Sequence, residues 1–159
     1  MGADRNEKSI IKDVLLSLLP FAEDSIFRSR YSFTFISKKT GYSESQVLRA
    51  YKSIKRRKLA YIEPDGRLRL SLAGRQMVQP FVAEKLSNDA KLMVIFDIPE
   101  DFAGRRQRLR NLLKQLDFKQ IQLSVWTTDK DHRKIVAESI IEYELQDWVQ
   151  MYEAAKIKS

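Results

Sequence analysis

One aspartate stands at a place where proteins often carry out chemistry, the end of an apolar strand. Asp97 follows the run LMVIF and precedes IPED. A carboxylate there is a candidate ligand for Mg²⁺, which often uses only one or two protein carboxylates together with substrate phosphates. Asp97 also suits a turn held by backbone amides or by a helix arginine such as Arg105 or Arg106. Acidic turn residues are common, so we favour the structural role and keep Asp97 as the one candidate catalytic residue and metal ligand.

Other side chains give little support to catalysis. The chain has no cysteine, which excludes disulfides, zinc–thiolate sites and cysteine nucleophiles. The single histidine, His132, lies in the polar segment DKDHRK, and we expect it to be exposed. Without a histidine beside it, Ser124 lacks a general base. We therefore expect no cofactor, and Mg²⁺ only if Asp97 belongs to a nuclease.

Charge is concentrated in one part of the chain. The net charge is +8 over 159 residues, and residues 28–75 alone hold 13 basic and 3 acidic side chains. A local excess of this kind is typical of a surface that binds nucleic acid, and we expect double-stranded DNA as the partner. No apolar run approaches the ~20 residues of a transmembrane helix. The first residues lack a signal-peptide pattern, so we expect no membrane association and a cytoplasmic location.

The basic region coincides with three predicted helices and a hairpin. The second helix is expected to end at Gly41, and the third begins with a capping box formed by Ser43 and Gln46. An apolar stripe on the third helix leaves a polar face free to contact phosphates or base edges. The turn Pro64-Asp65-Gly66 predicts the hairpin. The candidate DNA-binding residues are Ser45, Gln46, Arg49, Lys52, Ser53 and Arg56 on the third helix, with Arg67 and Arg69 on the hairpin.

This order of elements resembles the winged helix-turn-helix domains of bacterial transcription regulators. The segment LSLAGRQM is similar to the phrase that often ends the wing and opens the next helix. The resemblance implies that residues 1–76 form a DNA-binding domain whose third helix enters the major groove. The same fold also serves as a protein-interaction module, which is the alternative for this region.

Residues 91–159 predict a strand–helix–strand–helix–strand unit, preceded by a linker helix over 77–90. The run LMVIF is apolar on both faces, and KQIQLSVWTT alternates as one strand. Two helices cover only one face of such a sheet, which would leave Met93, Ile95 and Trp126, or their neighbours of opposite parity, exposed. We therefore expect a homodimer through this unit. Its predicted interface comprises Met93, Ile95, Gln122, Ser124 and Trp126.

Three phrases extend the resemblance: KLMVIFDIPED, RRQRLRNLLKQLDF and IQLSVW. In this order they resemble the central domain of the PaaX family of phenylacetate repressors, which is ferredoxin-like and similar to the second CRISPR-associated protein. Asp117 stands where that pattern ends its helix with glycine. The resemblance covers about residues 91–157.

This second resemblance implies an α+β fold, with an N-terminal winged helix-turn-helix followed by a ferredoxin-like dimerisation domain. It also implies a sequence-specific DNA-binding transcription regulator, a repressor, acting as a homodimer with an unknown effector ligand. In the CRISPR-type family the strand-end aspartate is the proposed metal ligand, one from each protomer. The alternative is therefore a metal-dependent endonuclease at Asp97, or a scaffold related to the small spacer-acquisition subunit.

Overall fold

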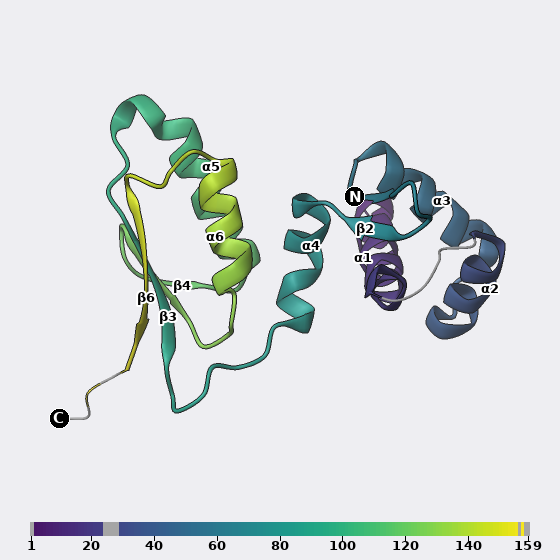
Figure 1. The fold of residues 1–159 in the computed structure, drawn as a ribbon, viewed down its shortest axis with the longest axis horizontal. Coiled ribbons are helices and arrows are strands. Elements are labelled where there is room, and N and C mark those ends of the chain that lie inside the picture. Colours follow the sequence, from purple (N-terminus) through teal and green to yellow (C-terminus); the bar gives the residue numbers. More distant parts are fainter. Residues whose placement is uncertain (1, 24–28, 156, 158–159) are drawn as a thin grey trace. The chain divides into compact units, whose positions relative to one another are not determined.

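A computed structural model describes residues 2–23, 29–155 and 157 of the chain (Figure 1). Helices and strands both occur, which confirms the predicted α+β class. The chain divides into two compact units, Met1–Val78 and Gln79–Ser159, and the boundary falls within a helix. The first unit contains α1 (Gly2–Glu23), α2 (Ser29–Thr40), α3 (Glu44–Arg56), β1 (Ala60–Ile62), β2 (Leu68–Leu70) and the start of α4 (Leu72–Val82).

The core of the first unit forms where α1 packs against α3. Apolar side chains recur on each helix at intervals of three and four residues, so they share one face. From α2, the Phe33 ring meets the Tyr51 ring edge to face, with 5.0 Å between centroids. The predicted stripes are confirmed, because Ile11, Val14, Leu15 and Leu18 of α1 and Val47, Ala50, Tyr51 and Ile54 of α3 are all buried.

Side-chain hydrogen bonds fix the turn between α2 and α3. Gly41 has φ +77°, a left-handed conformation that glycine adopts without cost, so α2 ends there as predicted. The predicted capping box is also confirmed: Ser43 Oγ accepts from the Gln46 backbone N–H, and the Gln46 side chain accepts from the Ser43 backbone N–H. The Tyr42 hydroxyl donates to Asp13 of α1 at 2.7 Å. These contacts set the direction in which α3 leaves the turn.

The predicted hairpin is confirmed as the antiparallel pair β1–β2. The Glu63 N–H donates to the Arg67 carbonyl at 2.8 Å, and Gly66 has φ +84°. After β2, α4 runs close against the start of the hairpin. A Cβ on Gly74 would lie 2.0 Å from the Leu59 carbonyl oxygen, so this position in LAGRQM requires glycine.

The second unit is a four-stranded antiparallel sheet with helices on one face (Figure 1). The strand order is β4-β5-β3-β6, and every neighbouring pair is antiparallel. The expected single strand over 119–128 is wrong, because this segment is a hairpin of two strands. The elements are β3 (Lys91–Phe96), a 3₁₀ turn η1 (Glu100–Phe102), α5 (Ala103–Gln115), β4 (Lys119–Gln122), β5 (Val125–Thr128), α6 (Arg133–Glu142) and β6 (Val149–Ala154).

Burial along β3 distinguishes the two faces of this sheet. Leu92, Val94 and Phe96 are buried, whereas the intervening Met93 and Ile95 are only half-buried. Alternation along a strand places the buried set beneath the helices and the half-buried set on the other face. The predicted α5 stripe is confirmed, since Leu109, Leu112, Leu113 and Leu116 are buried.

The segment after α4 joins the second unit through backbone hydrogen bonds. The Leu86 N–H donates to the Asp129 carbonyl at 2.7 Å, and the Asp131 N–H donates to the Glu84 carbonyl at 2.8 Å. The helix ends at Val82, so the predicted linker range 77–90 contains only its last part. Over the described residues, none of the helices has the length and apolar character needed to cross a membrane.

Candidate nucleic-acid interface and sheet surface

Four predicted DNA-binding residues form one exposed stripe along α3. Ser45, Arg49, Lys52 and Arg56 are all exposed. They follow one another at intervals of four, three and four residues, which places them on the same side of the helix. The Arg49 Nε–H donates to the Ser45 carbonyl at 3.4 Å, which leaves its two terminal nitrogens free to bind elsewhere. We call these four residues the α3 stripe.

The other two predicted DNA-binding residues of α3, Gln46 and Ser53, are not fully exposed. Ser53 is 6 % exposed and its Oγ accepts a 3.5 Å hydrogen bond from Arg56, so its assignment to the exposed face is wrong. The apolar side of α3 is wide enough to include it. Gln46 is half-buried, and its side-chain oxygen is occupied by the capping box at 2.9 Å from the Ser43 nitrogen. Its amide nitrogen remains available.

The hairpin arginines are already paired with acidic neighbours. Arg69 Nε lies 3.1 Å from a Glu63 carboxylate oxygen, and Arg67 Nε lies 3.5 Å from Asp65. Both arginines stand on the same side of β2, as the alternation of a strand requires. An anion that binds here competes with these carboxylates, so the hairpin contributes less net positive charge than its arginines suggest.

Two further lysines near α3 were missed by the sequence interpretation. Lys55 and Lys58 line a hollow of about 550 Å³ between α3 and β1. Lys58 has φ +53°, and the Leu59 N–H donates to the Ile54 carbonyl, so the helix ends in a left-handed turn that usually uses glycine. Only the excess of basic residues in 55–58 signalled this second group of cations.

The uncovered sheet face carries three of the predicted interface residues. Met93 and Ile95 lie there, and Gln122 joins them because it pairs with Val125, the cross-strand partner of Ile95. Ser124 lies in the β4–β5 turn, where its carbonyl accepts from the Phe96 N–H at 3.0 Å. Other side chains in register on this face are Val125, Thr127, Gln150 and Tyr152, the last 48 % exposed.

Trp126 was predicted to lie on the same sheet face as Met93 and Ile95, but it lies on the opposite face. It pairs with Val94 on the helix-covered face and is 2 % exposed. The prediction is wrong because the register between two strands decides which side chains share a face, and a shift of one residue reverses every assignment. Trp126 is a core residue of the second unit.

The Asp97 carboxylate is exposed, and no hydrogen bond or ion pair to it is found in the described part of the chain. The predicted arginine partners are wrong. Arg105 pairs with Glu144, and Arg106 pairs with Glu100 at 2.7 Å. Across the described residues, no three His, Asp or Glu side chains are grouped as a metal site would require. One isolated carboxylate offers a metal ion a single protein ligand, so one chain by itself does not fit a Mg²⁺ site.

His132 is buried, not exposed as predicted. It has no accessible surface, and the Phe118 ring lies 5.8 Å from its own ring. Burial lowers the pKa of this imidazole, and the nearby Lys130 lowers it further. The polar residues around His132 in the sequence did not indicate this burial, because the Phe118 ring that contacts it comes from the segment after α5. The buried His132 imidazole is a structural feature of the second unit.

The fold and these surfaces define an α+β protein with a helical unit that bears a basic helix, and a sheet unit with one face uncovered. Residues 88–159 match the model of the PaaX protein central Cas2-like domain. The predicted resemblance to the PaaX family is thereby confirmed for this domain, which covers slightly less than half of the chain. No curated protein and no solved structure matches the chain at a significant level.

Proposed function

We propose that the chain is a cytoplasmic, homodimeric transcription regulator, a repressor, that binds specific sites in double-stranded DNA. The observation that carries this proposal is the α3 stripe. Its three cations stand on one exposed helix face, and no acidic side chain among the described residues pairs with them. The match to a domain of a regulatory family, rather than an enzymatic one, agrees with it.

In this proposal the first unit is a winged helix-turn-helix. The α3 helix enters the major groove, where its polar side chains reach base edges and phosphates, and the β1–β2 hairpin is the wing. The capping box and the Tyr42–Asp13 hydrogen bond hold the start of α3 in place, which a recognition helix needs. Because Arg67 and Arg69 are paired within the hairpin, most of the affinity is assigned to α3 and to Lys55 and Lys58.

The direct test is selection of binding sites from a random pool of double-stranded DNA, followed by footprinting of the selected sequence. The proposal expects one enriched sequence with two half-sites related by two-fold symmetry. Its binding should weaken steeply with added salt, because phosphate contacts release counterions. A pool that shows no enrichment over several rounds would contradict sequence-specific binding.

The second unit is proposed to be ferredoxin-like and to hold the dimer through its uncovered sheet face. Met93 and Ile95 are half-buried there, and Tyr152 is 48 % exposed beside them. An apolar face on a four-stranded sheet is stabilised when a second copy covers it. The first unit of each protomer would then bind one of the two half-sites.

A charged side chain on this face tests the dimer. Ile95→Glu should give monomers at micromolar concentrations in sedimentation equilibrium, since burying the carboxylate at an interface is costly. Ile141→Glu is the matched control, because Ile141 of α6 is 61 % exposed and lies on an element of the opposite face. An unchanged dimer in Ile95→Glu, or a monomeric wild-type chain, would contradict the proposed interface.

A metal-dependent endonuclease remains the alternative that the strand-end aspartate suggests. The side chains around Asp97 do not favour it, since among the described residues no group of three or more His, Asp or Glu could hold a metal ion. Incubation with single- and double-stranded DNA and RNA and several divalent cations tests it. Cleavage that disappears in Asp97→Asn would replace the regulatory proposal for the second unit.

A further inference from the structure

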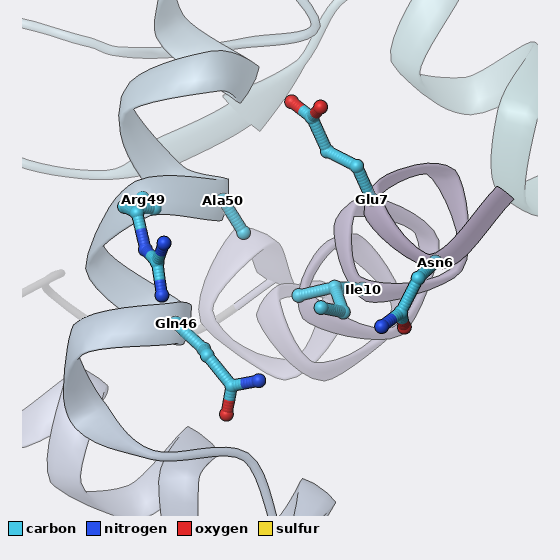
Figure 2. A pocket seen from close by; sticks show the side chains of 6 residues that line it. All are labelled: Asn6, Glu7, Ile10, Gln46, Arg49 and Ala50. Atoms are coloured by element: carbon cyan, nitrogen blue, oxygen red, sulfur yellow. The ribbon is translucent and has the colours of Figure 1, made fainter. Parts of the chain in front are cut away.

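A cavity lies between the first turns of α1 and the side of α3 that carries Gln46 and Arg49 (Figure 2). Its volume is about 380 Å³, within the range of small-molecule sites. The α1 side contributes Asn6, Glu7 and Ile10, and the α3 side contributes Gln46, Arg49 and Ala50. We call this the α1–α3 cavity.

The two walls of the α1–α3 cavity carry opposite charges. Glu7 supplies a carboxylate on the α1 side, and Arg49 supplies a guanidinium on the α3 side. No ion pair joins them, and neither charge is neutralised by another described residue. Unpaired charges of opposite sign, separated by open space, suit a ligand that carries both signs.

Amides and apolar atoms complete the lining. The Gln46 oxygen is held by Ser43, so its nitrogen is the free donor, and Figure 2 shows it directed toward α1. Asn6 adds a second amide from α1, while Ile10 and Ala50 lie between the polar walls. The α3 wall therefore offers donors to an anion, and the α1 wall offers acceptors to a cation.

We propose that the α1–α3 cavity binds a zwitterionic amino acid with an apolar side chain. Its carboxylate binds the free terminal nitrogens of Arg49 and the amide nitrogen of Gln46, and its ammonium group binds the Glu7 carboxylate. The side chain contacts Ile10 and Ala50. A simple anion is repelled by Glu7, and a simple cation is repelled by Arg49, so each is a poorer ligand.

Such a ligand is also an effector, and this second half of the proposal rests on the proposed DNA-binding function. Arg49 and Gln46 belong to the predicted DNA-binding set, and an amino acid that occupies them removes two contacts from DNA. The ligand therefore weakens DNA binding, and DNA weakens ligand binding by the same factor.

Calorimetric titration of the full chain without DNA tests the site. The probes are L-leucine, L-isoleucine, L-valine and L-phenylalanine, with 4-methylpentanoate and 3-methylbutylamine as leucine analogues that lack one charge each. At least one amino acid should bind, and the matched single-charge analogue should bind at least about tenfold more weakly, the loss expected for one charged hydrogen bond. Failure of all four amino acids to bind at about 10 mM would overturn the proposal.

Variants separate this site from general effects. Glu7→Gln should weaken amino-acid binding at least about tenfold, whereas Glu142→Gln, the same change at an exposed residue of α6, should leave it unchanged. Equal affinity of Glu7→Gln and wild type would overturn the assignment. Amino-acid binding by a chain that selects no DNA sequence would uphold the site and refute the proposed function. Selective DNA binding that saturating amino acid leaves unchanged would refute the effector role.

Discussion

Acidification is predicted to destabilise the second unit through His132. The imidazole has no exposed surface, and neither ring nitrogen has a hydrogen-bond partner among the described residues. Burial lowers its pKa below the ordinary 6.5, and the charge of Lys130 adds to this shift. The nearby Leu116 carbonyl and the carboxylates of Asp117 and Asp131 act in the opposite direction and do not reverse it.

The sign and size follow from proton binding in the two states. The unfolded chain regains the ordinary histidine pKa, so between the two pKa values it binds more protons than the folded chain. His132 should therefore not lower the free energy of unfolding above pH 6.5. Below pH 6.5 it should lower that free energy by up to about 1.4 kcal/mol per pH unit, until the pKa of the folded state is reached. Asp131, whose pKa is lowered by its hydrogen bond with Arg133, titrates only below its ordinary 3.8 and does not overlap this window.

Two features of the sequence make the assay specific. Both tryptophans, Trp126 and Trp148, belong to the second unit, so their fluorescence reports its unfolding by urea. Titrations between about pH 5 and 7.5 should show a loss of stability that is absent in His132→Leu. His132 is also the only histidine, so NMR follows its titration in the wild-type chain without a variant. Parallel pH profiles for the two proteins, or a folded-state pKa at or above 6.5, would refute the reasoning.

Three substitutions in the first unit test how α3 is held, each by urea unfolding followed by circular dichroism. Gly74→Ala should destabilise it by about 1–3 kcal/mol, because the added Cβ meets the Leu59 carbonyl; an unchanged midpoint would mean that α4 approaches less closely. Tyr42→Phe should cost about 0.5–1.5 kcal/mol through its lost hydrogen bond to Asp13, and no change would place that bond outside the stable fold. Lys58→Gly should stabilise by about 1 kcal/mol, and destabilisation would show that the lysine side chain contributes to folding.

Local periodicity predicted the helices well. The stripe on α3 was predictable because Val47, Ala50 and Ile54 recur at helical spacing, and only one packing direction buries them together. The capping box at Ser43 was equally local. Ser53 was assigned to the wrong face because the buried face of α3 is wider than the stripe of apolar residues in its sequence.

The errors lie where contacts are distant in sequence. The turn between β4 and β5 falls at Leu123 and Ser124, without glycine or proline, so the alternation continues through it. The face of Trp126 depends on its register with Val94, which neither strand encodes alone. The burial of His132 involves Phe118, which follows α5 and contacts the imidazole only in the folded unit.

The central claim is that the α3 stripe binds DNA, and affinity as a function of salt concentration tests it most directly. Titrations of the selected DNA sequence should compare wild type, the double variant Arg49→Ala/Lys52→Ala, and a matched control, Lys114→Ala/Lys134→Ala, which removes two exposed cations from the second unit. The α3 variant should bind at least about tenfold more weakly, and its plot of log affinity against log salt should be shallower by about 2. The control should match the wild type. Equal affinity and equal slope for the α3 variant and the wild type would contradict the account.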